Sequence, residues 1–317
     1  MERVLITGVA GFIGSQLAER IHSKGLEVIG IDNFSTGNAE NLSNLVDSRH
    51  FTLFRGDILK LKGLSKAFKD VGTVFHMAAQ SSVPKSTEDP VQDFEINVRG
   101  TLNVLECARK TDVKKVIFAS SSTVYGEASV LPTSEEHPFL PISNYGAGKA
   151  AAEAYCSSYS SLYGLKIASL RYYNIFGPRS RKGVMFDLLQ KLQKDNKKLE
   201  VLGTGREAKD YLHIDDAVDA TLLVAERGKL SGEAYNIGSG KSYSVKELVD
   251  KLLKILGLAG KTNPFYTGFS WLGDVQKTLA DISKLKKLGF KPMVGIDKGM
   301  KTFVDWYRSK YGEIAAG

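Results

Sequence analysis

The stretch N-Y-G-A-G-K-A-A-A-E, residues 144–153, carries a tyrosine and a lysine four positions apart. Its alanines favour a helix, on which Tyr145 and Lys149 share one face. Gly146 and Gly148 each cost such a helix about 1 kcal/mol relative to alanine, so we expect that a Cβ at either position would collide with a bound molecule. Because a nearby ammonium stabilises a phenolate and lowers the pKa of the phenol, this spacing indicates a site for proton transfer.

A second chemical motif opens the chain, where V-L-I-T-G-V-A-G-F-I-G-S places Gly8, Gly11 and Gly14 after an apolar run. Glycine is needed where a strand turns tightly into a helix and the backbone approaches a pyrophosphate, although a purely structural turn is the alternative. Asp32 follows Gly14 by 18 residues, at the end of the next apolar run, where its carboxylate can accept both hydroxyls of a ribose. That carboxylate would repel a 2′-phosphate. The pattern therefore predicts a dinucleotide site for NAD rather than NADP.

Short apolar runs alternate with amphipathic segments through the first half of the chain, as in a parallel sheet covered on both faces. Strands are predicted at residues 3–7, 27–31, 51–55, 73–76, 115–120 and 166–171, and helices at 12–24, 61–69, 91–110 and 144–163. This alternation predicts an α/β fold with a doubly wound parallel sheet of the Rossmann type over residues 1–177. Asp57, after the third strand, could reach an adenine, although such a residue is also a common loop cap.

The regular alternation of strands and helices ends after residue 177. Beyond it, helices are predicted at 184–195, 245–256 and 298–311 among shorter strands. Residues 178–317 are therefore expected to form a smaller α/β C-terminal portion that mainly binds the substrate. A segment around residues 210–240 is expected to return to the first sheet, with a strand at 235–237.

The composition, 43% hydrophobic and 25% charged over 317 residues, is that of an ordinary globular protein. Neither a signal peptide nor an apolar run of about 18 residues is visible, so we expect a cytoplasmic protein that does not bind membranes. The net charge is +8, but the lysines are scattered without interleaved aromatics, which argues against nucleic acid. Cys107 and Cys156 are interpreted as buried free thiols rather than a disulfide. No metal site is expected.

With these residues in place, the chain resembles the extended short-chain dehydrogenase/reductase family, and within it the UDP-glucose 4-epimerase-like nucleotide-sugar epimerases. The resemblance covers nearly the whole chain. It is carried by T-G-V-A-G-F-I-G-S, I-D-N-F-S-T-G, G-D-I, H-M-A-A-Q, I-N-V-R-G-T, S-S-S-T-V-Y-G, N-Y-G-A-G-K, R-Y-Y-N-I-F-G-P-R, K-D-Y-L-H-I-D-D, N-I-G-S-G and G-D-V-Q-K-T-L-A-D-I-S-K. It implies NAD as cofactor, a UDP-sugar as substrate, and epimerisation through a transient 4-keto sugar.

The resemblance also implies roles for individual residues. Tyr145 would be the catalytic base, Lys149 its partner and a ribose ligand, and Ser121 the hydroxyl that bonds the reacting oxygen, with Ser120 and Ser122 each one position away. The residues implied to line the cofactor are Tyr145, Lys149, Gly8, Gly11, Phe12, Ile13, Gly14, Asp32, Asn33, Asp57, Ile58, Ala78, Ala79, Asn97 and Tyr172. Those implied to contact the substrate are Ser122, Thr123, Asn174, Val184, Lys209, Trp271, Asp274 and Thr278.

The chain departs from the family at Lys209 and Trp271, where arginine is usual. Arginine binds a phosphate with two hydrogen bonds, so the nucleotide is expected to be held differently here. Three arginines, at positions 179, 181 and 206, could compensate. Ser122 and Thr123 stand where related dehydratases and decarboxylases carry carboxylates, which favours simple 4-epimerisation.

The identity of the sugar stays open between three candidates, with UDP-glucose and UDP-galactose ranked first. Thr278 is small where bulk helps to exclude a 2-N-acetyl group, so UDP-GlcNAc would fit as well. Arg181 could meet a C6 carboxylate, which makes UDP-glucuronate the third. A nucleotide-sugar dehydrogenase or reductase and a catalytically silent NAD-binding sensor are the alternatives, and the intact Tyr, Lys and Ser set argues against the sensor.

A homodimer is also expected. The helical segments 91–110 and 144–163 carry apolar and small residues beyond what packing on their own sheet needs, and the family often dimerises through a four-helix bundle formed from such a pair. Burial within one chain is the alternative. The residues in question are Phe94, Leu105, Ala151, Ala154 and Tyr159.

Overall fold

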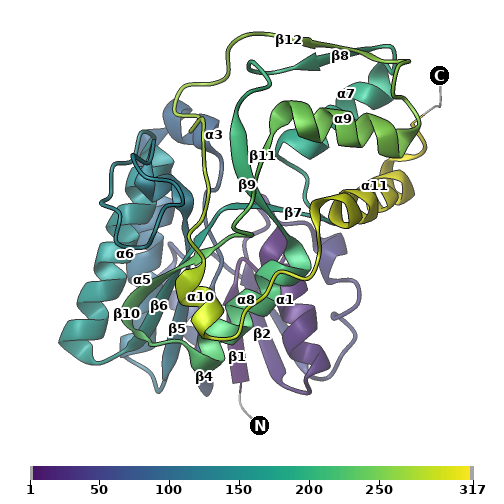
Figure 1. Ribbon diagram of the computed structural model, residues 1–317. Helices are drawn as coiled ribbons and strands as arrows, with labels where there is room; N and C mark the ends of the chain where they lie inside the picture. Colours follow the sequence, from purple (N-terminus) through teal and green to yellow (C-terminus); the bar gives the residue numbers. More distant parts are fainter. Residues whose placement is uncertain (1–2, 315–317) are drawn as a thin grey trace.

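The computed structural model describes residues 3–314, and its first half is built around a seven-stranded parallel sheet (Figure 1). The strands lie in the order β10-β6-β5-β4-β1-β2-β3, and each neighbouring pair is parallel. Their bounds are β1 Arg3–Thr7, β2 Glu27–Asp32, β3 Phe51–Arg55, β4 Val71–His76, β5 Lys115–Ser121, β6 Lys166–Tyr172 and β10 Ser231–Ile237. The order in which successive strands are added to the sheet reverses between β1 and β4. Open α/β sheets bind ligands at such a point. The predicted doubly wound sheet is confirmed.

Helices cover both faces of this sheet (Figure 1). On one face, α1 (Phe12–Ser23) and α8 (Ile214–Arg227) bury an apolar stripe against the strands. On the other face, α2 (Leu61–Ala67), α5 (Gly100–Arg109) and α6 (Asn144–Tyr163) do the same. Because both faces are covered, most strands are buried along nearly their whole length, which explains their continuous apolar runs.

The helix predicted at residues 91–110 is confirmed as an unbroken helical stretch, although its hydrogen bonding changes in the middle. After the short helix α3 (Val83–Glu88), α4 (Pro90–Phe94) continues through a π-helical turn, η2 (Glu95–Arg99), directly into α5. Asp89 caps α4 by accepting from the Gln92 amide at 2.9 Å, and Pro90 starts that helix. A π-helical turn inside a helix is rare and frequently marks a functional site. Here it contains Asn97.

The C-terminal portion forms two further small sheets and a second hydrophobic core. One sheet contains β7 (Asn174–Phe176), β9 (Ala208–His213) and β11 (Ser242–Ser244), and the other β8 (Lys198–Val201) and β12 (Asn263–Tyr266). Its helices are α7 (Val184–Lys194), α9 (Val245–Leu256), α10 (Ser283–Lys287) and α11 (Ile296–Tyr311). In Figure 1 most of this portion lies above the sheet. From β9 the chain passes through α8 into β10, which pairs with β6 as predicted.

Two other sequence-based expectations can be compared with the structure. Cys107 and Cys156 are both buried and free, as predicted. Within residues 3–314, no helix has the length and apolar character needed to cross a membrane.

Candidate active site

The turn between β1 and α1 is closed so tightly that it excludes side chains at two glycines. Gly8 has a φ of +69°, and a Cβ there would lie 2.7 Å from the Ala78 amide nitrogen. A Cβ at Gly14 would lie 2.2 Å from the Gly8 carbonyl oxygen. The helix that follows begins at Phe12 and Ile13 behind Gly11, and no side chain caps its N-terminus. Its first amides are therefore available to an anion, as a pyrophosphate-binding turn requires.

The ends of β2 and β3 bring Asp32, Asn33 and Asp57 together at the same edge. The buried Asp32 carboxylate accepts from the amides of Ala10 and Phe34, each at 2.8 Å. Burial raises its pKa, while the two amides act in the opposite direction. Asn33 Nδ2 donates to Asp57 Oδ2 at 3.0 Å. Because each carboxylate oxygen can accept more than one hydrogen bond, Asp32 retains acceptor capacity for a ribose.

The loop after β4, which contains Ala78 and Ala79, is tied to the π-helical turn. Asn97 Nδ2 donates to the Gln80 carbonyl and to Asp93 Oδ1, both at 2.9 Å. The Asn97 Oδ1 atom is buried and has no hydrogen-bond partner within residues 3–314. An unpaired buried acceptor costs about 1–3 kcal/mol, so this atom indicates a missing ligand with a donor. Together with the glycine turn, it shows that these residues fit a dinucleotide.

The predicted catalytic residues meet where β5 ends beside the first turns of α6. Ser143 caps α6 by accepting from the Gly146 amide at 3.1 Å. The Ser121 hydroxyl lies close enough to the Tyr145 phenol to act on its pKa, and the Ser121 Oγ accepts from the Thr123 hydroxyl at 3.0 Å. Lys149 Nζ is buried, donates to the Ala119 carbonyl at 2.9 Å and lies 5.9 Å from the centroid of the tyrosine ring. Of the three serines considered, Ser121 is therefore the one beside the phenol.

Burial dominates the electrostatics of this pair. Burial raises the pKa of Tyr145 to about 12, against a smaller lowering by the hydrogen bond with Ser121. Burial also lowers the pKa of Lys149 to about 8, although the Asp93 carboxylate opposes this. Within the chain alone the lysine therefore does not bring the phenol towards neutrality, because desolvation of the phenolate outweighs every favourable contact. The predicted lowering of the phenol pKa also relies on the positive charge of the nicotinamide ring, and it stays a prediction.

The two helix glycines allow close packing within the chain itself. A Cβ at Gly146 would lie 2.6 Å from the Thr123 carbonyl oxygen, and one at Gly148 would lie 3.1 Å from Asp93 Oδ2. A side chain at either position would therefore already meet the protein's own neighbouring turns, and a collision with a bound molecule stays a prediction. The missing side chains allow α6 to approach the serine-bearing turn η3 (Ser122–Tyr125) and the π-helical turn closely.

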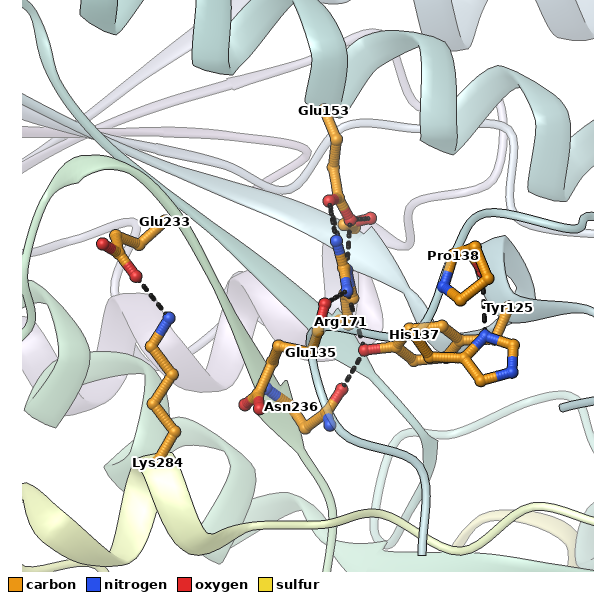
Figure 2. A network of polar contacts seen from close by, with 10 residues as sticks. Tyr125, Glu135, His137, Pro138, Glu153, Arg171, Glu233, Asn236 and Lys284 are labelled. Atoms are coloured by element: carbon orange, nitrogen blue, oxygen red, sulfur yellow. Dashed lines mark hydrogen bonds and ion pairs between the residues drawn. The ribbon is translucent and has the colours of Figure 1, made fainter. Parts of the chain in front are cut away.

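A buried polar network joins the elements that carry these residues (Figure 2). The Arg171 guanidinium donates to Glu153 of α6 and, through Nη1, to the Tyr125 hydroxyl, each at 2.8 Å. Ser120 Oγ also donates to Glu153. These contacts join β5, β6, α6 and η3, so they fix the strand end that carries the catalytic serine. Sequence reasoning missed this network, although Lys149 and Glu153 are one helical turn apart, a spacing that places both on one face.

The candidate substrate residues gather around β9. Lys209 of this strand forms an ion pair with Asp274, and its Nζ lies 5.8 Å from the centroid of the Trp271 ring. Thr278 accepts from the Asp210 amide of the same strand through Oγ1 at 3.0 Å, and with Ser122 it lines a small cavity. Thr123 lies beside Ser121, the Asn174 amide donates to the Asp210 carbonyl at 3.2 Å, and Val184 begins α7. The lysine and the tryptophan that replace the usual arginines thus contact one another.

Several other predicted residues are engaged elsewhere. The Tyr172 hydroxyl forms a hydrogen bond with Thr221 of α8 at 2.6 Å, so the structure does not bring that hydroxyl to the other cofactor residues. Ile58 is buried beside Gly100. Arg179 and Arg181 form ion pairs with Glu19 and Glu40. Leu105 and Tyr159 are buried within the chain, which favours the intramolecular alternative for those two residues, whereas Phe94 and Ala154 are exposed and Ala151 is half-buried.

Comparisons with known proteins agree with this geometry. The model of the NAD dependent epimerase/dehydratase family matches residues 4–238. A UDP-glucose 4-epimerase of Mycolicibacterium smegmatis is 36% identical over 97% of this chain and 99% of its own. The chain belongs to the NAD dependent epimerase/dehydratase family. The resemblance read from the sequence is thereby confirmed, and NAD, the predicted cofactor, is the one for which this family is named.

Two further relatives place the chain within that epimerase/dehydratase family. A UDP-glucuronate 4-epimerase of Thermodesulfobacterium geofontis is 34% identical over 95% of both chains. The crystal structure of a UDP-glucose 4-epimerase from Thermotoga maritima with UDP-glucose has a TM-score of 0.90 at 35% identity, and covers 97% of this chain and 99% of that chain. Relatives that act on different UDP-sugars therefore share this fold over almost the whole chain.

Proposed function

We propose that this protein interconverts the 4-epimers of a UDP-sugar with NAD, and that UDP-glucose and UDP-galactose are its preferred pair. The observation that carries the proposal is the contact of the Tyr145 phenol with Ser121, beside the buried Lys149, at the ligand-binding edge of the sheet. Related UDP-glucose and UDP-glucuronate 4-epimerases support the substrate class. Residues 1–177 would mainly bind the cofactor and residues 178–317 the UDP-sugar.

NAD, when bound, would supply a reversible hydride acceptor at C4 of the sugar, which allows the hydride to return to either face. The phenolate of Tyr145 takes the proton of the 4-hydroxyl. In the protein alone the pKa of this phenol is about 12, and each unit of lowering corresponds to about 1.4 kcal/mol. Several kcal/mol must therefore come from the positive charge of the oxidised cofactor and from the substrate. The base is formed only when the site is loaded.

Ser121 and Lys149 position the reacting groups. Ser121 already contacts the phenol, so its hydroxyl can bond the sugar oxygen from which the proton leaves. An ammonium has three N–H donors, and Lys149 uses one of them on the Ala119 carbonyl. The other donors remain for the hydroxyls of a ribose, which would hold the cofactor ring against the tyrosine.

Epimerisation is favoured over dehydration and decarboxylation by the two residues after Ser121. Ser122 and Thr123 supply hydroxyls where those reactions need a carboxylate that transfers a second proton. The buried carboxylate of Asp93 is engaged through Oδ1 by Gln80 at 2.8 Å and by Asn97 at 2.9 Å. Formation of a 4-keto-6-deoxy sugar would contradict this assignment.

The protein is also proposed to form a homodimer through the exposed surfaces of α4 and α6. Phe94 is 54% exposed, Val91 69% and Leu162 70%, which is unusual for large apolar side chains on neighbouring helices. Sedimentation of the wild type against a Phe94→Asp variant tests this. A wild-type monomer at micromolar concentration would contradict it.

The central assay incubates the purified protein separately with UDP-glucose, UDP-GlcNAc and UDP-glucuronate and resolves the products chromatographically. We expect UDP-galactose to form from UDP-glucose until equilibrium, without net production of NADH. Stoichiometric NADH would instead indicate a dehydrogenase, and no conversion of any sugar would indicate a sensor. Faster conversion of UDP-glucuronate or UDP-GlcNAc would contradict the preferred sugar while retaining the reaction.

A further inference from the structure

The loop between β7 and α7 carries three cations that differ in their partners. Arg179 forms an ion pair with Glu19 at 2.7 Å, and Arg181 forms one with Glu40 at 3.0 Å. For Lys182, in contrast, no carboxylate lies within ion-pair distance in the part of the chain that the structure describes. The loop is therefore anchored to the first half of the molecule by two arginines, while its third cation lacks a counter-charge.

The Lys182 ammonium reaches the loop after β4, at the edge of the candidate active site. Its Nζ donates to the Ser81 carbonyl at 2.9 Å and to the Ser81 hydroxyl at 2.5 Å. The flanking Gln80 donates to Asp93 at 2.8 Å and to the Ser82 carbonyl at 2.9 Å. Ser81 thus belongs to the polar cluster that holds Asn97. Lys182 therefore spans from the C-terminal portion to the loop that is expected to line the cofactor.

The Lys182 ammonium lies within electrostatic range of a second cation of the site. Its side chain is exposed, yet the surrounding chain lowers the pKa of its ammonium to about 8. The charge of Lys182 also helps to lower the pKa of the buried Lys149. Two ammonium groups that repel each other are a cost that a bound anion removes. Ser81 engages two of the three donors of Lys182, which leaves one for a ligand.

We propose that Lys182 binds an anionic oxygen group of the sugar nucleotide, either the diphosphate or a carboxylate at C6 of the sugar. The assignment rests on the proposed function for the identity of the ligand. Sequence reasoning offered Arg181 for a C6 carboxylate, but Glu40 holds that guanidinium. Lys182, one residue further, is the cation of this loop that remains available at the site.

Isothermal titration calorimetry on the NAD-loaded protein tests this with UDP, UDP-glucose and UDP-glucuronate as ligands. The variants are Lys182→Met and, as a matched control, Arg181→Met, which removes the same charge from the same loop. A lost charge-assisted contact should raise Kd about tenfold or more in Lys182→Met, and Arg181→Met should change it much less. Lys182→Arg should retain most of the affinity.

The pattern across ligands identifies the anion. Equal weakening for all three ligands assigns the diphosphate, and weakening confined to UDP-glucuronate assigns the carboxylate. Unchanged Kd values for all three ligands, or equal losses in Lys182→Met and Arg181→Met, overturn the proposal. A wild type that binds these ligands but converts neither sugar would contradict the proposed function alone, because the binding comparison at Lys182 remains valid.

Discussion

Two successive turns of helix α6 bury ionisable side chains in contrasting ways. Lys149 is 2% exposed, and within residues 3–314 its ammonium bonds a backbone carbonyl but forms no ion pair with a carboxylate. Glu153, one turn later, is 6% exposed and fully engaged by Arg171 and Ser120. Burying an unpaired charge is costly, whereas burying a paired one is tolerated. We therefore assign the turn with Lys149 to ligand binding and the turn with Glu153 to holding the helix in place.

The same contrast recurs around the site. Lys182 lacks the carboxylate that its neighbours Arg179 and Arg181 have, and Asn97 Oδ1 lacks a donor. These incompletely satisfied groups lie on segments that meet at one edge of the parallel sheet. The Arg171 network, in contrast, pairs its guanidinium with Glu153 and Tyr125. Substitutions in these incompletely paired groups and in the paired network should therefore have different consequences.

The largest effect is expected from Tyr145→Phe on the reactive turn. Removal of a general base typically lowers kcat by about 10²–10⁴-fold, and the ring that packs beside Lys149 is retained. NAD affinity, measured by fluorescence titration, should change little because the variant loses only one hydroxyl. A kcat within tenfold of the wild type would show that another group takes the proton.

The supporting turn is tested by Arg171→Met, which leaves the buried Glu153 carboxylate without its partner. Loss of one member of a buried ion pair typically lowers the free energy of unfolding by about 3–5 kcal/mol. Urea denaturation measures this, with the double variant Glu153→Gln, Arg171→Met as control. The double variant should be more stable than the single one. Equal stability of both would mean that the charge of Glu153 is not held by Arg171.

The unpaired charge of Lys149 predicts a pH dependence of stability with a definite sign. Burial lowers the pKa of this amine from 10.5 to about 8 in the folded protein. The unfolded chain therefore binds more protons between these values, and the free energy of unfolding should rise with pH through that window. The expected gain is roughly 1–3 kcal/mol relative to Lys149→Met, measured by urea denaturation of cofactor-free protein. A difference between the two proteins that does not vary with pH would contradict the assigned environment.

The smallest effects concern the two glycines, which should differ from each other. Alanine gains about 1 kcal/mol of helix propensity at either position. In Gly146→Ala the new Cβ meets the rigid Thr123 carbonyl at 2.6 Å, and overpacking of this kind costs about 1–3 kcal/mol. In Gly148→Ala the neighbour is a carboxylate oxygen at 3.1 Å, which can move slightly. Thermal unfolding should show Gly146→Ala to be the less stable variant, and the reverse order would be contrary to the packing described.

Much of the cofactor half could be predicted from the sequence, because its signals are local. Short stretches of sequence specify the strands of the first half, the glycine turn and the position of Asp32, because each requires a particular local backbone conformation. Helix α6 was predicted with the same ends that the structure shows. The π-helical turn around Asn97 could not be predicted, since a break in helical hydrogen bonding leaves the apolar periodicity almost unchanged.

The substrate side was less predictable because its partners are far apart in the chain. The Lys209 to Asp274 ion pair and the Lys182 to Ser81 contact each join segments separated by more than sixty residues, and no spacing rule links them. The burial of the Tyr145 phenol, which raises its pKa, could not be predicted for a related reason. The sequence shows the neighbouring lysine but not the long-range packing that buries the phenol.

The central claim, that a hydride leaves C4 of a UDP-sugar for NAD and returns while Tyr145 handles the proton of the 4-hydroxyl, is tested most directly with UDP-glucose deuterated at C4. Mass spectrometry and NMR of the product locate the label. The account predicts UDP-galactose with deuterium still on C4 and none exchanged into solvent. Product that has lost the label to water, or deuterium that accumulates in released NADH, would contradict it.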